Sequence, residues 1–427
     1  MKMRKYNVGL EIHGKQIKVG TIEGESSETA QFTYSGEFLS GGDAHPISVA
    51  LPLQWEAFSS RETKNFFDGL LPEGFMRRAI AGNMHFDEGD YLSILHNLGK
   101  ECLGALRIYT DEEESVFSYE PLSPKQVEEL ASEGATKSTE LVIKTHLSLT
   151  GASGKVGLYY EDSADKWYLP VGLAPSTHIV KQSHIRLDGI VTNEQLSMLT
   201  ASKCGVQIPQ SFIINMGGGL DSEVLFATRR YDRTFEGATK NMDGLTIPLR
   251  IHQEDFAQAM GVASFDKYEK EGQDYARRMF EILRTYATNP LEDQLALWRR
   301  IVFNYVIGNT DSHIKNFSLL YNADMTGVRL APAYDIIGTL IYESATRELS
   351  FNIGGIRNID EVKRDSFVAM AGMVGLGEKP ALRVYDEVLD RFESALKESA
   401  KELTDIGFES AGSICERILQ SRKKMFL

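Results

Sequence analysis

The stretch Gly308-Asn309-Thr310-Asp311-Ser312-His313-Ile314-Lys315-Asn316-Phe317 decides the fold class, and it follows a strongly apolar segment with helical periodicity. Its Asp311 and Asn316 have the Asp-x-x-x-x-Asn spacing of kinase catalytic loops. In such a loop the aspartate accepts the proton of the acceptor hydroxyl, and the asparagine ligates magnesium. We therefore predict Asp311 as the catalytic base and Asn316 as a metal ligand.

A second carboxylate lies downstream, in Tyr334-Asp335-Ile336. Asp335 is predicted to hold Mg²⁺ against the phosphates of ATP, because carboxylate and amide oxygens suit this hard ion, whereas zinc or iron would want more His or Cys. An Asp–Asn pair at this spacing also arises by chance, and a helix-terminal Asx turn is the alternative for Asp311. The downstream carboxylate and the upstream loop and lysine described next favour the kinase interpretation.

A glycine-rich turn lies upstream, between predicted strands, and ends at Lys155. It is no P-loop, because Leu149 occupies the first glycine position and Val156 replaces the Ser/Thr magnesium ligand. A kinase-type flap fits better, with backbone amides near the ATP phosphates and Lys155 or Lys181 as a point charge. A plain turn between two strands stays an alternative. The predicted flap residues are Thr150, Gly151, Ala152, Ser153, Gly154 and Lys155.

The chain is predicted to have an α+β fold of the bilobal protein-kinase type. Residues 1–110 form a small α+β subdomain that includes a helix over 61–81, and residues 111–145 a connector. Residues 146–250 form a strand-rich ATP-binding lobe, with Lys181 on the strand His178-Ile179-Val180-Lys181. Residues 251–427 form an all-helical catalytic lobe, since segments such as 290–306 and 380–398 have 3.6-residue periodicity.

Composition and charge argue against several other classes of protein. The 427 residues carry a net charge of −14, which works against general binding of nucleic acids by this chain. Three cysteines, Cys102, Cys204 and Cys415, lie far apart, which argues against zinc ribbons and disulfide scaffolds. The basic N-terminus precedes alternating rather than continuous apolar residues, so we expect no signal peptide, no membrane contact and a cytoplasmic protein.

Several blocks of the sequence, in order along nearly the whole chain, resemble the HipA family of toxin kinases. Outside the chemistry, Asn65 to Pro72 is similar to the family's N-terminal helix signature. Ser148 to Lys155 is similar to its Ser-Val-x-Gly-Ala-Gln-x-Lys loop. Thr310 to Asn316 is similar to Thr-Asp-x-His-x-Lys-Asn, and Pro332 to Ile336 resembles the metal-binding segment.

The resemblance implies roles that spacing does not show. It implies that Ser148 is autophosphorylated, with Thr150 or Ser153 as competing acceptors, and that Lys181 contacts ATP. The stretch Arg229-Arg230-Tyr231 resembles the interlobe hinge whose backbone receives the adenine. His313 and Tyr334 are carried over as cofactor-binding residues beside Asp335.

The resemblance further implies a serine/threonine protein kinase that uses ATP and Mg²⁺ and acts as the toxin of a toxin–antitoxin system. An aminoacyl-tRNA synthetase is the implied substrate. A helix-turn-helix antitoxin of the HipB type is the implied partner, and operator DNA is reached mainly through it. A small-molecule phosphotransferase stays open because such enzymes share the Asp-x-x-x-x-Asn logic. A catalytically silent antitoxin partner or corepressor also stays open.

Overall fold

The computed structural model describes residues 3–42, 44–111, 116–133, 137, 141–142, 154–183, 187–217 and 223–425. Its internal contacts divide the chain into two units. The first comprises Met1–Gln182, Ala227–Ser264 and Leu319–Val328, and the second comprises Ser183–Phe226, Phe265–Ser318 and Arg329–Leu427. Each is described by itself below.

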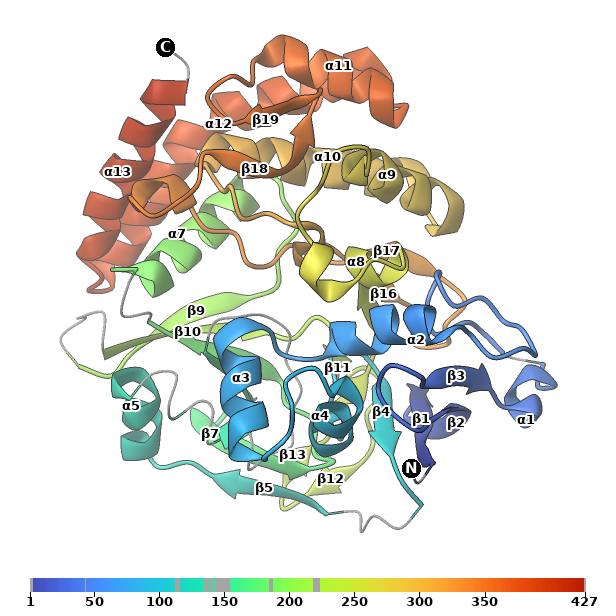
Figure 1. Ribbon diagram of the computed structural model, residues 1–427. Helices are drawn as coiled ribbons and strands as arrows, with labels where there is room; N and C mark the ends of the chain where they lie inside the picture. The colour runs from blue at the N-terminus through green and yellow to red at the C-terminus, as the bar shows by residue number, and fades with distance from the viewer. Residues whose placement is uncertain are drawn as a thin grey trace. The chain divides into compact units, whose positions relative to one another are not determined.

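The first unit begins with a four-stranded antiparallel sheet of order β3-β2-β1-β4 (Figure 1). Its central strand is buried from Tyr6 to Leu10, whereas the outer part of β2 is exposed. The strands are β1 (Arg4–Ile12), β2 (Lys15–Gly24), β3 (Gln31–Tyr34) and β4 (Leu106–Tyr109). The helices of this region are α1 (Gly36–Leu39), α2 (Ser60–Phe67), α3 (Gly74–Asn83) and α4 (Tyr91–Leu98), with the 3₁₀ turn η1 (Asp68–Leu70).

Helix α2 shows how the sequence starts and ends these elements. Ser59 caps its first turn, and Glu62 returns the hydrogen bond to the backbone of Ser59, which satisfies otherwise unpaired amides. Its Phe66 and Phe67 are buried and join the core beneath the sheet. The single helix predicted over 61–81 is therefore wrong, because the chain turns at Pro72 and resumes as α3.

A six-stranded sheet of order β5-β7-β6-β8-β10-β9 follows. Lys155 on β6 pairs directly with Lys181 on β8 in the antiparallel register, so both side chains point to one face. The strands are β5 (Phe117–Pro121), β6 (Lys155–Glu161), β7 (Lys166–Gly172), β8 (His178–Gln182), β9 (Ser211–Asn215) and β10 (Val224–Arg229). The helix α5 (Pro124–Ser132) follows β5, and α7 (Ile190–Lys203) belongs to the second unit.

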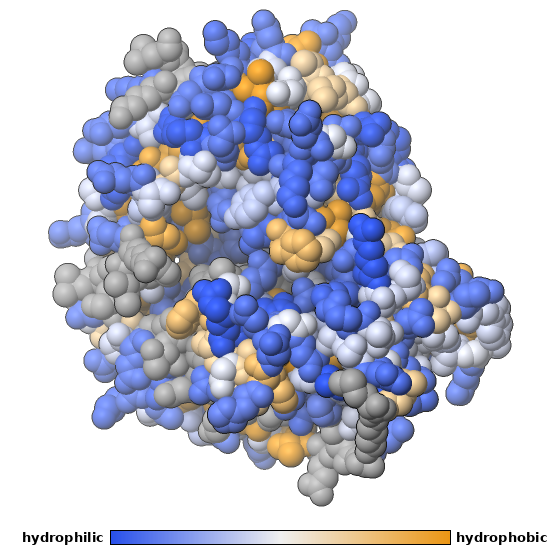
Figure 2. Space-filling model, viewed as in Figure 1, coloured by the Kyte–Doolittle hydropathy of each residue, from blue (hydrophilic) through white to orange (hydrophobic). Residues whose placement is uncertain are grey.

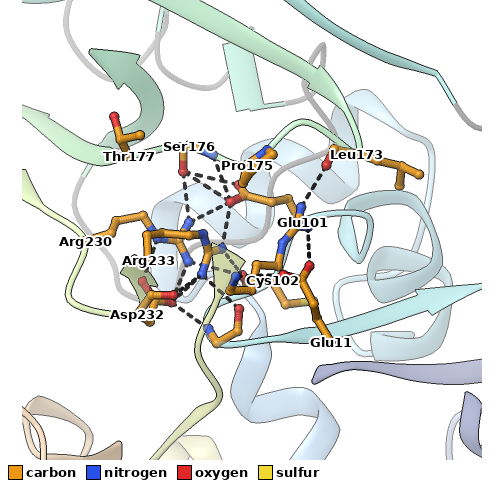
Figure 3. Close-up of polar contacts among 12 residues, drawn as sticks. Glu11, Glu101, Cys102, Leu173, Pro175, Ser176, Thr177, Arg230, Asp232 and Arg233 are labelled. Carbon is orange, nitrogen blue, oxygen red and sulfur yellow. Dashed lines mark hydrogen bonds and ion pairs between the residues drawn. The ribbon is translucent and has the colours of Figure 1, made fainter. Parts of the chain in front are cut away.

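A buried cluster of charges joins distant segments within the first unit (Figure 3). Arg230 forms ion pairs with Glu101 at 3.0 Å and with Asp232 at 2.7 Å. Arg233 pairs with the same two carboxylates at 2.7 and 3.0 Å. Ser176 donates its backbone amide to Glu101, so the turn before β8 is held as well. Two cations and two anions balance, and these four charged side chains are at most 4% exposed.

Short strands and turns complete the first unit after β10. Two two-stranded ribbons, β11 with β14 and β12 with β13, precede a three-stranded sheet of order β15-β16-β17. The strands are β11 (Arg233–Thr234), β12 (Asn241–Met242), β13 (Leu245–Thr246), β14 (Leu249–Arg250), β15 (Gln253–Asp255), β16 (Ser318–Tyr321) and β17 (Val328–Leu330). The short helix α8 (Phe256–Ala259) and the 3₁₀ turn η3 (Ser264–Asp266) follow β15.

The second unit is mainly helical, but the prediction of an all-helical lobe over residues 251–427 is wrong, because this range contains the strands β15, β16 and β17 and a further hairpin. Glu348–Ile353 and Ile356–Asn358 form the antiparallel hairpin β18–β19, which turns through Gly354 and Gly355 with φ of 59° and 84°. The helices are α9 (Tyr275–Tyr286), α10 (Pro290–Ile307), α11 (Arg364–Val374), α12 (Glu378–Asp405) and α13 (Ser410–Met425), with 3₁₀ turns η4 (Ile314–Asn316) and η5 (Thr339–Ile341). Trp298 of α10, fully buried, lies at the centre of their packing.

The face shown in Figure 2 is mostly hydrophilic, with separate hydrophobic patches between polar residues. Large exposed hydrophobic side chains include Trp55, Phe265 and Leu291, at 65%, 77% and 65% exposure. Within the described residues, no helix combines the length and the hydropathy needed to cross a membrane.

Candidate active site

The predicted catalytic loop begins where α10 ends. Gly308 adopts φ 77°, a left-handed conformation that glycine reaches without a Cβ penalty, and it terminates the helix. The loop then carries Asp311, which is exposed although its neighbours on both sides are buried. An exposed carboxylate on a loop held by a buried frame is available to a substrate.

Asn316 fixes the backbone of this loop. Its Nδ2 donates to the carbonyl oxygen of Asp311 at 2.9 Å. This bond uses the donor atom of the amide, and the other atom, Oδ1, is an acceptor. The two residues of the Asp-x-x-x-x-Asn spacing therefore lie together, as the sequence predicts for a catalytic loop.

Arg300 ties this loop to the segment of the second carboxylate. It is 2% exposed on α10, and its Nη2 donates to the carbonyl oxygens of Asn316 and Tyr334, the latter at 3.3 Å. Its guanidinium also lies over the ring of Phe317, at 4.4 Å from the centroid. The hydroxyl of Tyr334 in turn donates to the carbonyl oxygen of Lys315 at 2.9 Å. Tyr334 thus supports the loop through its side chain.

Asp335 has an unusual backbone. Its φ of 53° lies in the left-handed region, which costs a non-glycine residue about 1 kcal/mol and is retained where the surroundings demand it. Asn309 approaches its carbonyl oxygen with Nδ2 at 3.5 Å. Asp335 and Asn316 offer the oxygen ligands that Mg²⁺ prefers, whereas no group of three or more His, Cys, Asp or Glu suited to a metal occurs in the described part of the chain. The donor set fits an ion completed by water and phosphate oxygens.

The Asp311 carboxylate contacts an aromatic residue that the sequence did not single out. The hydroxyl of Tyr268 donates to Oδ1 of Asp311 at 2.7 Å. The ring of Tyr268 meets that of His313 edge to face, at 5.3 Å between centroids and an angle of 88°. His313 is 7% exposed, so it lies beneath the loop rather than open to solvent.

The predicted phosphate-binding lysines belong to the first unit. Lys155 and Lys181 are 8% and 9% exposed and oppose each other on β6 and β8. Opposed residues in an antiparallel pair place their Cβ atoms within about 5.5 Å, so both lysines leave the same face of the sheet.

The three predicted hinge residues, Arg229, Arg230 and Tyr231, differ in burial and in what they contact. The Arg230 side chain is committed to the buried cluster of Figure 3, and its backbone amide donates to the carbonyl oxygen of Thr177 at 2.8 Å. Neither group is open to an adenine, so Arg230 stabilises the hinge instead. Arg229 and Tyr231 are half-buried on either side of it. Tyr231 donates its hydroxyl to Gln253.

The flap lies largely outside the described residues. This applies to Ser148, Thr150, Gly151, Ala152 and Ser153, so their predicted roles stay predictions. Gly154 and Lys155, which lead into β6, are described.

Comparisons with known proteins identify the family. The HipA-like C-terminal domain matches residues 147–396, more than half of the chain, and the HipA N-terminal domain matches residues 10–109. The chain belongs to the HipA family. A putative kinase of Sinorhizobium fredii is 31% identical over 389 residues, 89% of each chain. The serine/threonine-protein kinase toxin HipA of Shewanella oneidensis is 25% identical over 387 residues, 86% of this chain and 83% of the relative.

A solved structure supports the same HipA fold. It contains HipA of Shewanella oneidensis with HipB and its operator DNA, and it matches with a TM-score of 0.78 at 20% identity over 98% of this chain and 96% of that one. The predicted α+β fold of the kinase type is thereby confirmed.

For this HipA-family chain, sequence reasoning missed three residues of the candidate site. Arg300, Tyr268 and Ser350 contact the catalytic loop from α10, from the segment before α9 and from β18. Arg300 carried a signal, since an arginine within an apolar helix needs buried partners. Tyr268 and Ser350 carried none that spacing can show.

Proposed function

We propose that this HipA-family chain is a serine/threonine protein kinase that uses ATP and Mg²⁺, with Asp311 as catalytic base. The observation that supports it best is the exposed Asp311 carboxylate on a loop fixed by Asn316 and joined through Arg300 to the backbone before Asp335. Phosphoryl transfer needs no covalent protein intermediate, only positioning and neutralisation of charge. The relatives named as kinases agree with this reaction class.

Each residue has a defined task in this proposal. Bound magnesium-ATP supplies the phosphoryl group. Asp311 accepts the proton of the acceptor hydroxyl, while Oδ1 of Asn316 and the carboxylate of Asp335 hold the metal. Lys155 and Lys181 offset the charge of the phosphates, which agrees with their opposed positions on one face of the sheet.

The remaining predicted contacts belong to the flap and the hinge. Thr150, Gly151, Ala152, Ser153 and Gly154 would cover the phosphates through their backbone amides. Arg229 and Tyr231 would receive the adenine through the backbone. His313 and Tyr334 would act by supporting the loop, since His313 is a buried residue of the loop and Tyr334 donates to the carbonyl oxygen of Lys315 in it.

We extend the proposal to a toxin of a toxin–antitoxin system. The solved HipA relative is in complex with HipB and operator DNA, which supports a helix-turn-helix antitoxin of the HipB type as partner. The net charge of −14 agrees with DNA contact mainly through that antitoxin. A translation component such as an aminoacyl-tRNA synthetase is the proposed substrate, and Ser148 the proposed autophosphorylation site.

The test is phosphorylation by the purified chain with Mg²⁺ and radiolabelled ATP, followed by mass-spectrometric mapping of the label. We expect label at Ser148 and a loss of about 10²–10⁴-fold in rate for Asp311→Asn, because a base of this kind contributes that much. Asp405→Asn, at the exposed end of α12, is the matched control and should retain the full rate.

Other outcomes separate the alternatives. Full activity of Asp311→Asn would remove Asp311 as base. Label at Thr150 or Ser153 would keep the kinase and move the acceptor. No label and no thermal shift by magnesium-ATP would favour the catalytically silent partner, because ligand binding would stabilise the folded state by mass action. No label with a thermal shift would leave the silent partner and a kinase that acts only on another protein.

A further inference from the structure

The Asp311 carboxylate is already engaged by a hydroxyl of the chain itself. Tyr268 donates to Oδ1 of Asp311 at 2.7 Å, the distance of a full hydrogen bond to a charged acceptor. An acceptor hydroxyl of a substrate must donate to the same carboxylate before its proton can be taken. The tyrosine hydroxyl and the substrate hydroxyl therefore present the same chemical group to one base.

The position of Tyr268 is built into the second unit. The next residue, Glu269, is 6% exposed and accepts the backbone amides of Tyr275 at 2.7 Å and Asn352 at 2.6 Å. Its own amide donates to the carbonyl oxygen of Ser350 at 2.8 Å. Arg357 donates to its carbonyl oxygen at 2.8 Å. The backbone beside Tyr268 is thus anchored to β18 and α9.

The same strand anchors the catalytic loop. The hydroxyl of Ser350 donates to the carbonyl oxygen of Thr310 at 2.8 Å. One residue of β18 therefore holds both the neighbour of Tyr268 and the neighbour of Asp311. The contact between their side chains follows from this shared anchor and does not depend on a loosely held loop.

The Tyr268 side chain is 42% exposed. Its ring meets that of His313 edge to face, and the ammonium of Lys267 lies 5.6 Å from the ring centroid. The anchor is made by Glu269, so a rotation about χ1 of Tyr268 breaks the hydrogen bond without disturbing the backbone. Exposed side chains change rotamer in picoseconds to nanoseconds.

We propose that Tyr268 occupies the acceptor-hydroxyl position on Asp311 and that a protein substrate must displace it. This inference rests on the proposed kinase function and adds a specificity-determining residue to it. A substrate binds only the fraction of molecules in which Tyr268 has left, so its apparent Kd is the intrinsic Kd divided by that fraction. An acceptor that donates well to the carboxylate and replaces the ring against His313 is favoured over one that does not.

The first test measures transfer from radiolabelled ATP to myelin basic protein, used as a general acceptor. Tyr268→Phe keeps the ring and removes the hydroxyl. A hydrogen bond to a charged group favours the bonded state by roughly ten- to a hundredfold, so we expect KM for the acceptor to fall by about that factor while kcat and KM for ATP stay the same. Tyr286→Phe, a 49% exposed tyrosine at the end of α9, should match the wild type.

The outcomes distinguish a failure of this inference from a failure of the proposed kinase function. If neither the wild type nor Tyr268→Phe needs Asp311 for transfer, Asp311 is not the base, and the inference about Tyr268 fails with it. Transfer that depends on Asp311 but shows an unchanged KM in Tyr268→Phe would overturn the displacement alone. A lower kcat in Tyr268→Phe would also overturn it and make Tyr268 a positioning residue for the base.

A second measurement needs no activity. Denaturation of Tyr268→Phe, Asp311→Asn and the double variant forms a double-mutant cycle, which isolates the pairwise interaction. We expect the two changes to be non-additive. Strict additivity would show that the side chains do not interact in solution and would overturn the proposal.

Discussion

Two sets of charged residues in this chain differ in what surrounds them. In the buried cluster of Glu101, Asp232, Arg230 and Arg233, called the Glu101 cluster below, each carboxylate faces both arginines, and the four charges are removed from solvent (Figure 3). In the predicted catalytic loop, Asp311 is exposed and accepts a hydrogen bond from the hydroxyl of a partly exposed tyrosine, Tyr268. Burial with balanced partners marks charges that hold segments together, whereas an exposed charge on a rigid frame is available for chemistry.

The pKa values of the first set follow from the same contrast. Burial alone would raise the pKa of Asp232, but the attraction of Arg230 and Arg233 outweighs burial and lowers it well below its usual range. The pKa of Glu101 is lowered for the same reasons, although it is fully buried. Both groups therefore stay ionised across the physiological range and serve the fold rather than proton transfer.

Among the changes that test this contrast, the largest effect is expected at Asp335. We predict that Asp335→Asn folds, because asparagine tolerates the left-handed φ of 53°, but loses magnesium-dependent phosphotransfer by about 10²–10³-fold. The measurement is initial rate against Mg²⁺ concentration, with melting temperature as the check on folding. A wild-type rate would mean that the Asp335 carboxylate is not needed for phosphotransfer. Asp335 would then belong with the structural charges, like those of the Glu101 cluster.

The next effect is on stability and tests the buried set. Glu101→Gln leaves the charges of Arg230 and Arg233 with one carboxylate between them, and breaking a buried pair costs about 3–5 kcal/mol. We expect the free energy of unfolding in urea to fall by that order. Glu236→Gln, an exposed glutamate of the same unit, is the matched control. An equal and small effect of both changes would show that the cluster is not needed for stability.

Sequence reasoning predicted the contacts of the candidate site that are local in the chain and missed those that are not. Asn316 holds Asp311 from five residues away, so spacing alone predicts the pair. Tyr268 meets Asp311 across 43 residues, and Ser350 meets Thr310 across 40. Such contacts depend on how α9 and β18 pack, and no periodicity encodes that packing.

The same limit explains the hinge and the second lobe. The sequence around Arg230 predicts a hinge residue. Its partner Glu101 lies 129 residues earlier, and only the fold brings the two charges together. The helix α10 was predicted almost to the residue because its apolar spacing is long and regular. The hairpin β18–β19 was missed, because its short strands carry too few residues for a pattern.

A smaller effect is expected at Glu254, a carboxylate that is buried like Glu101 but whose pKa is raised rather than lowered. Ser48 and Tyr321 donate to it, the latter at 2.6 Å, yet burial dominates and raises its pKa to about 7. Between its ordinary pKa and pH 7 the folded state binds more protons than the unfolded one, so its contribution to stability falls as pH rises through this window.

Glu254→Gln removes this titration. The stability difference, wild type minus Glu254→Gln, should therefore become less favourable by roughly 1–3 kcal/mol between pH 5 and pH 8. Urea denaturation of both proteins at the two pH values measures it. A constant difference would mean that Glu254 does not titrate in this range and is held ionised by its donors, as Glu101 is by its arginines.

The smallest effect is expected at an exposed ion pair of the second unit. Arg364 donates to Asp386 at 3.0 Å, but both side chains are about half exposed, at 49% and 53%. Water and salt screen such a pair, and holding two long side chains in one geometry offsets the attraction. Asp386→Asn should leave the melting temperature unchanged at low and high salt, whereas Glu101→Gln should lower it at both. A large loss from Asp386→Asn would show that pairing alone stabilises this fold and that burial is not what distinguishes the two sets of charges.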